Sequence, residues 1–253
     1  MALTGYRSGV IRGPKEDLAA RDSTAPGRTN AVVAGVLLIV ATSASLLAEP
    51  FLAPVTGSDY LTAPAGHHAQ VAIGVLLGLI AAFAAPGVAI ALYPVLRRFG
   101  EGLSLGAVGF RIIEGAFYAL QMTVLLSLGT LSRQFVDAGA PADQHYTTLG
   151  HTMQAQDHWL GQVGLLLAFS IGGLLYYLVF YRSRLIPVWL SVWGIAGALL
   201  LMVSGMLILF GAIEPMSGVQ LALAAPIAVQ EMVLAVWLIV KGFNQSALVG
   251  RQA

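Results

Sequence analysis

Long uninterrupted apolar runs are the feature that most constrains this chain. Six of them reach about 20 residues or more, which is the length of α-helix that crosses a hydrocarbon core roughly 30 Å thick. They lie at about 30–49, 69–96, 103–131, 157–181, 187–211 and 220–241. A helix also satisfies its own backbone hydrogen bonds in lipid, where water is absent. The sequence therefore predicts an all-α integral membrane bundle of six transmembrane helices, spanning residues 30–243.

The composition excludes several classes of function. Hydrophobic residues make up 57% of the chain and charged residues 10%, against roughly 45–50% and about 25% in a soluble domain. A net charge of +1 gives no basic field for nucleic acid, and the chain has no phosphate-binding or dinucleotide motif. Because the chain contains no cysteine, thiolate metal sites and Cys nucleophiles are excluded. No serine lies in a Gly-x-Ser-x-Gly elbow, so an enzyme is not the class we expect.

The distribution of Lys and Arg predicts the orientation in the membrane, since these residues accumulate in cytoplasmic segments. Eleven of the 13 fall on one side of the predicted helices, Arg133 falls on the other, and Arg111 lies inside a helix. The eleven are Arg7, Arg12, Lys15, Arg21, Arg28, Arg97, Arg98, Arg182, Arg184, Lys241 and Arg251. We therefore expect both ends in the cytoplasm, with residues 1–29 as a disordered tail and residues 244–253 as a second tail. A cleaved signal peptide is the alternative for the first apolar run.

Three ionisable side chains, Arg111, Glu114 and Glu231, lie well inside predicted helices, where charges are expensive and indicate function by default. At about 1.5 Å per residue, all three lie roughly 13 to 18 Å from a helix end, near the midplane. Arg111 and Glu114 share a helix face at the i, i+3 spacing. Further hydrogen-bonding side chains in this region are Tyr118, Gln121 and Gln230. We expect the third and sixth helices to be in contact, with Arg111 between the two carboxylates.

Two interpretations of this cluster remain open. Two acids against one base leave one carboxylate without a full partner, which is typical of a proton-coupling group. A purely structural network that fixes the helix register is the alternative. Pro86 and Pro226 interrupt two of the helices, either to line a cavity or only to fit the bundle's shape.

The histidines suggest a different kind of site. All five are expected on the outer side, and Asp157 precedes His158. Imidazole and carboxylate ligands suit zinc or copper, and two histidines on facing helices can ligate a haem. The candidate ligands are His67, His68, His151, Asp157 and His158. Solvated or interfacial histidines, with no cofactor, are the alternative.

Three segments carry a resemblance to a known family. The first is Phe110-Arg111-Ile112-Ile113-Glu114, and the second runs from Ile186 to Gly194, with Pro187 and Trp189 near its start. The third runs from Gln230 to Leu238 and contains Glu231. The chain resembles, from roughly Thr29 to Phe243, a bacterial multi-pass membrane family catalogued as a domain of unknown function (DUF4386-like). The resemblance implies a six- or seven-helix protein of a bacterial inner membrane. It implies no activity, cofactor or catalytic residue.

Three hypotheses for function follow. The first is binding or proton-linked transport of a small amphipathic molecule at the midplane site. The second is an outer-face metal or haem protein that uses the histidines. The third is a non-catalytic membrane partner or sensor whose basic tail, residues 1–29, meets anionic lipid or a cytoplasmic protein.

Overall fold

The computed structural model describes residues 27–141 and 144–249, and these form helices and turns with no strand among them. Six helices are long and apolar enough to cross a membrane, which confirms the predicted all-α bundle. They are α2 (Arg28–Thr56), α4 (His68–Leu96), α5 (Glu101–Asp137), the continuous run Gln144–Ser183, α8 (Val188–Leu209) and α9 (Gly218–Val240). Residues 1–26 of the first predicted tail and residues 250–253 of the second lie outside the described residues.

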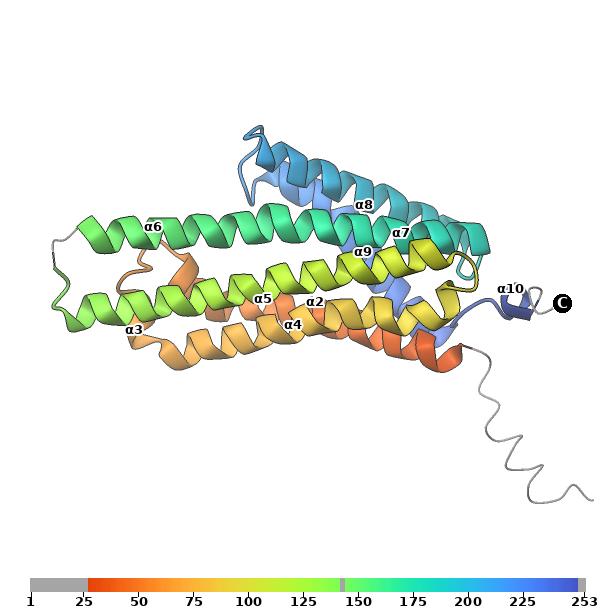
Figure 1. The fold of residues 1–253 in the computed structure, drawn as a ribbon, viewed down its shortest axis with the longest axis horizontal. Helices are drawn as coiled ribbons and strands as arrows, with labels where there is room; N and C mark the ends of the chain where they lie inside the picture. The colour runs from red at the N-terminus through yellow and green to blue at the C-terminus, as the bar shows by residue number, and fades with distance from the viewer. Residues whose placement is uncertain (1–26, 142–143, 250–253) are drawn as a thin grey trace, which may run out of the picture.

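The long run Gln144–Ser183 consists of three segments. It begins as α6 (Gln144–Trp159), passes through the π-helix η1 (Leu160–Leu165) and ends as α7 (Leu166–Ser183). Figure 1 shows α6 and α7 as one rod lying along α5. The helix therefore begins at Gln144, 13 residues before the apolar run predicted from residue 157. Hydropathy identifies residues that suit lipid, but it does not locate the first residue of a helix. Two short helices, α3 (Ala63–Gly66) and α10 (Gln245–Val249), complete the described chain.

The six long helices form a ring in chain order. Each packs against its predecessor and its successor, and α9 returns to pack against α2. Since the connections are short, neighbouring helices run in opposite directions, and both described ends of the chain lie at the same end of the bundle (Figure 1). That end carries Arg28, Arg97, Arg98, Arg182, Arg184 and Lys241, whereas Arg133 lies near the opposite end of α5. We call these the basic end and the outer end.

Glycine lies at every junction of the ring. A Cβ atom at any of these glycines would lie within 3.3 Å of the facing helix, so each one lets two helices approach closely. In order round the ring they are Gly74 (α4 against α2), Gly115 (α5 against α4), Gly172 (α7 against α5), Gly194 (α8 against α7), Gly197 (α8 against α9) and Gly35 (α2 against α9).

The proline in α4 takes part in one of these junctions. Pro86 has no amide hydrogen and therefore frees the carbonyl of Ala82 one turn earlier. Gly115 lies against that carbonyl, at a distance where an added Cβ would be 2.5 Å from the Ala82 oxygen and 3.2 Å from the Pro86 ring. The interruption of α4 is thus filled by the backbone of α5, directly beside Glu114.

Candidate functional site

Arg111, Glu114 and Glu231 meet in the interior of the ring. Their exposed fractions are 2%, 4% and 8%, so all three are buried. The Arg111 guanidinium donates through Nη1 to both oxygens of Glu114, at 2.9 and 3.1 Å, and through Nη2 to Oε1 of Glu231, at 2.9 Å. Arg111 therefore lies between the two carboxylates, as the sequence predicts.

The contact between the third and sixth helices is made by side chains. Helices α5 and α9 are not neighbours in the ring, and in the described structure they do not pack along a shared face. Arg111 extends from α5 across the interior to reach Glu231 on α9. Its guanidinium carbon lies 4.4 Å from the centre of the Phe169 ring, so an aromatic face covers the cation.

A tyrosine from α7 completes the ion cluster. The hydroxyl of Tyr176 accepts a hydrogen bond from Nη2 of Arg111 at 2.8 Å and donates one to Oε1 of Glu231 at 3.3 Å. Tyr176 is 1% exposed, so this hydroxyl replaces water as a partner for both charges. Sequence reasoning missed Tyr176, because a tyrosine in an apolar run does not show by itself which face of the helix it lies on.

A second hydrogen-bonded chain continues from the cluster towards α8. The hydroxyl of Tyr177 donates to Oε1 of Gln230 at 2.5 Å, and Nε2 of Gln230 donates to the carbonyl of Leu190 at 3.1 Å. The rings of Tyr176 and Tyr177 lie 4.4 Å apart, which joins the two parts. We call the residues Arg111, Glu114, Tyr176, Tyr177, Gln230 and Glu231 the buried network; it ties together α5, α7, α8 and α9.

The three segments on which the family resemblance depends meet at this network. The first provides Arg111 and Glu114, and the third provides Gln230 and Glu231. The second provides the Leu190 carbonyl, in a helix that begins directly after Pro187. Segments far apart in the chain therefore contribute to one polar centre.

The chemistry available to the network follows from its charges. One guanidinium faces two carboxyl groups, so the cluster carries a net charge of −1 when both carboxyls are ionised. Glu114 accepts through both oxygens, whereas the bonds to Glu231 within the described structure all use Oε1. Nε of Arg111 is buried with no hydrogen-bond partner among the described residues. The network can therefore take up one positive charge, and Glu231 retains an oxygen for it.

Tyr118 and Gln121, which the sequence groups with these residues, lie elsewhere. Gln121 points to α6, where its Nε2 donates to the Asp157 carbonyl at 3.5 Å, and it packs against Gly161. Tyr118 packs with the apolar cluster of α2, α4 and α5 near the outer end. The reason is depth, because Tyr118 and Gln121 lie four and seven residues beyond Glu114, which is roughly 6 and 10 Å further along α5 at about 1.5 Å per residue.

A groove lies along α5, one helical turn beyond Glu114. It has a volume of about 450 Å³ and opens between α5 and α6. Its wall is mostly apolar, with Thr123 and Gln156 as the polar members; the others are Phe117, Leu120, Val124, Trp159 and Leu160. Phe117 is one helical turn from Glu114 and also packs against Gly164 in the π-helix. π-Helical turns occur frequently at functional sites.

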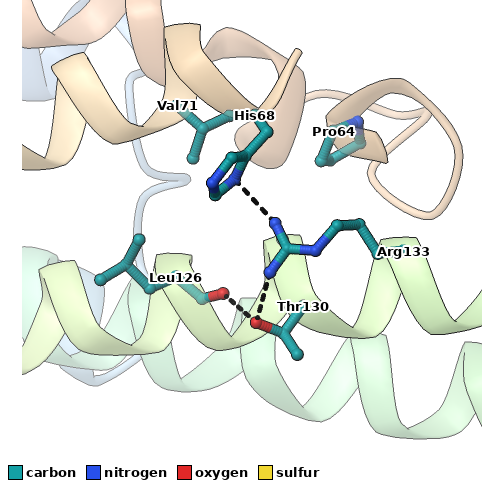
Figure 2. Close-up of a pocket in the computed structure, with 7 residues that line it drawn as sticks. Pro64, His68, Val71, Leu126, Thr130 and Arg133 are labelled. Atoms are coloured by element: carbon teal, nitrogen blue, oxygen red, sulfur yellow. Dashed lines mark hydrogen bonds between the residues drawn. The ribbon is translucent and has the colours of Figure 1, made fainter. Parts of the chain in front are cut away.

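One histidine pairs with the arginine of the outer end. Figure 2 shows the Arg133 guanidinium between His68 and Thr130, in a pocket of about 240 Å³ between α4 and α5. Nη1 of Arg133 lies 2.7 Å from Nδ1 of His68, and Nη2 donates to the Thr130 hydroxyl at 3.2 Å.

The other proposed metal ligands each have different surroundings. Nδ1 of His67 lies 2.8 Å from the Ala63 carbonyl, His151 packs edge-on against Tyr60, and His158 packs edge-on against Trp159. Asp157 has one buried oxygen without a hydrogen-bond partner among the described residues. Across residues 27–141 and 144–249, no three His, Asp or Glu side chains gather in a group that could hold a metal ion. The metal or haem site stays a prediction.

Comparison with known proteins gives one match. A family model described as a domain of unknown function (DUF4386) matches residues 33–242, a range that contains the whole buried network. Comparisons with curated proteins and with solved structures find no match.

Proposed function

The chain belongs to the DUF4386 family, and we propose that it is a bacterial inner-membrane protein that binds or transports a small amphipathic molecule in step with a proton. The observation that carries this proposal is the arrangement of two buried carboxyl groups around one guanidinium in the interior of a closed ring of helices. An uncompensated charge is costly in such a site, so the uptake of a proton or of a cationic group is favoured there.

Glu231 is the residue that we assign to the exchange. Its side chain is 10% exposed, against 6% for Glu114 and 2% for Arg111. Glu114 is held by two hydrogen bonds from a residue on its own helix, whereas Glu231 reaches the guanidinium from another helix. Protonation of Glu231 would weaken the bond between α5 and α9, and so a proton would alter how these two helices are held.

The groove between α5 and α6 is the place that we assign to the amphipathic molecule. Its volume of about 450 Å³ lies in the range of about 300–1,000 Å³ that is usual for small-molecule sites. An apolar chain fits the Phe117 and Leu120 wall, and Thr123 or Gln156 can bond to a polar group. Because Glu114 and Phe117 are one turn apart, a shift of α5 would connect the two sites.

The distribution of cations supports the orientation in this proposal. The basic end carries the described Lys and Arg residues apart from Arg111 and Arg133, so it is assigned to the cytoplasm by the positive-inside rule. Both termini would then be cytoplasmic, and the pocket around Arg133 would face the outside.

Binding in nanodiscs at several pH values tests the proposal. Amphiphiles of equal chain length with cationic, neutral and anionic heads would be titrated into the wild type, Glu231→Gln and Glu214→Gln, the last being the same change at an exposed residue. For one linked proton, the affinity of the wild type should change up to about tenfold per pH unit. Glu231→Gln should remove this dependence and Glu214→Gln should keep it. The proposal is wrong if the wild type shows no pH dependence with any of the three, or if Glu231→Gln retains it.

A further inference from the structure

A pocket of about 370 Å³ lies at the basic end, away from the buried network and the groove. It is formed where the turn between α7 and α8 meets the turn between α9 and α10, with Val188 and Trp237 as the contributions of α8 and α9. The other lining residues are Arg184, Leu185, Ile186, Pro187, Lys241, Gly242, Phe243 and Asn244.

The pocket has an apolar floor and a cationic rim. Leu185, Ile186 and Phe243 are 0%, 2% and 3% exposed, and they form the floor. Arg184 and Lys241 are exposed on the rim. Within the described residues no ion pair is formed by Arg184 or Lys241, and no carboxylate lines this pocket, so the two rim charges have no anionic partner in the described chain.

The two turns that form the pocket are fixed to each other. The amide nitrogen of Asn244 donates to the Leu185 carbonyl at 2.8 Å, and the Asn244 side chain donates to the Arg184 carbonyl at 3.4 Å. Below them, Arg28 donates to the carbonyls of Leu238 and Ile239, at 3.4 and 2.6 Å, where α9 ends. The pocket is therefore preorganised and does not depend on loose loops.

Arg184 is the C-cap residue of α7, and its amide nitrogen donates to the Phe180 carbonyl at 2.9 Å. Arg184 has a φ of 53°, in the left-handed region that favours glycine and asparagine. Helices commonly end with a residue in this conformation, so the end of α7 explains the backbone at this position. At this position the conformation keeps a long cationic side chain on the rim of the pocket.

The surroundings place the pocket at the boundary between lipid tails and headgroups. Val188, Trp189 and Tyr181 are 42%, 53% and 47% exposed at the same end of the bundle, and tryptophan and tyrosine concentrate at that boundary. Basic pockets between transmembrane helices bind anionic lipid headgroups. We propose that this pocket binds one anionic phospholipid, with its phosphate between Arg184 and Lys241 and its first acyl carbons along Val188 and Trp237.

Lipid selectivity tests this proposal with a matched control. The wild type, Arg184→Gln/Lys241→Gln and Arg97→Gln/Arg182→Gln would be placed in nanodiscs of phosphatidylcholine with phosphatidylglycerol, and the lipids retained on release would be counted by native mass spectrometry. Each double variant removes two cations from the basic end, but Arg97 and Arg182 do not line the pocket. Lys241→Gln alone serves as the variant that leaves Arg184 in place.

We expect the wild type and the Arg97→Gln/Arg182→Gln control to retain one phosphatidylglycerol in preference to phosphatidylcholine. This preference should fall about fivefold for Lys241→Gln and about 25-fold for the pocket double variant, at the strength usual for a basic residue near an anionic headgroup. An equal loss in the control would mean general surface charge and would overturn the proposal, as would full retention in the pocket variant. Displacement by millimolar inorganic phosphate would mean a free-phosphate site, which also overturns it.

Discussion

Helix α5 carries two arginines in contrasting environments. Arg111 lies in the interior, is 2% exposed and has two carboxylates, a tyrosine hydroxyl and an aromatic face as partners. Arg133 lies 22 residues further along the same helix and has a histidine ring nitrogen and a threonine hydroxyl as its partners in Figure 2. Both cations are hydrogen-bonded, but only Arg111 has anions beside it.

The difference between the two arginines shows where a charge matters for the stability of this fold. An ion in a low-dielectric interior loses its hydration, so it is stable only with close counter-charges and further hydrogen bonds. At the end of a helix, water and polar headgroups supply that solvation, and a direct ion pair adds little. Arg111 should therefore be essential for stability and Arg133 should not, which the following changes test.

Replacing Arg111 with methionine should have the largest effect. It leaves Glu114 and Glu231 buried without their cation, and breaking a buried ion pair costs about 3–5 kcal/mol. The free energy of unfolding in mild detergent, measured by denaturant titration, would show the loss. Arg133→Met is the matched control and should change it by less than about 1 kcal/mol. Equal losses in the two variants would refute the contrast drawn here.

Gly115→Ala should have the second-largest effect on stability, because it disturbs the close contact between α5 and α4 beside Glu114. The added Cβ would lie 2.5 Å from the Ala82 oxygen and 3.2 Å from the Pro86 ring. Forcing an extra methyl group into a close-packed contact costs about 1–3 kcal/mol. Thermal unfolding measures the effect, and Gly109→Ala on the same helix is the control, since its Cβ meets nothing within 4 Å. The control should be neutral or stabilising by up to about 1 kcal/mol.

Tyr176→Phe separates the hydroxyl from the ring. The variant keeps the aromatic packing but leaves Arg111 and Glu231 without one hydrogen-bonding partner each, at a cost of about 1–3 kcal/mol. Denaturant titration would measure the loss in the free energy of unfolding, with Tyr181→Phe, whose ring is exposed, as the control. A loss no larger than that of the control would show that the hydroxyl is not needed to stabilise the ions.

His68→Ala should have the smallest effect. It removes one partner of Arg133 in a region that solvent reaches, where a hydrogen bond contributes about 0.5–1.5 kcal/mol at most. The melting temperature should therefore change by only a few degrees. A loss as large as that of Arg111→Met would mean that the outer-end pocket, and not the buried network, organises the bundle.

The sequence predicts most of the architecture because membrane helices are marked by hydropathy alone, and it predicts the position of Arg111 because a buried cation requires an anion. It does not predict Tyr176 or Tyr177, since the hydropathy of a tyrosine in an apolar run is the same whether it faces lipid or the interior. Tyr118 and Gln121 share a helix face with Glu114 by their spacing, but they lie further along α5 and have other partners. Spacing along a helix identifies a face, but which helix lies against that face is decided by the order of the whole ring.

In this ring, α9 and α2 are the one pair of neighbouring helices that no segment of the described chain connects. Helix α9 packs against α2, and both described ends of the chain lie at the same end of the bundle as the connection at 97–100 (Figure 1). A circular permutant that joins the two ends by a linker and begins at α5 would keep every helix–helix neighbour. It would also keep an even number of crossings, so its new termini would lie on the same side of the membrane as the old ones.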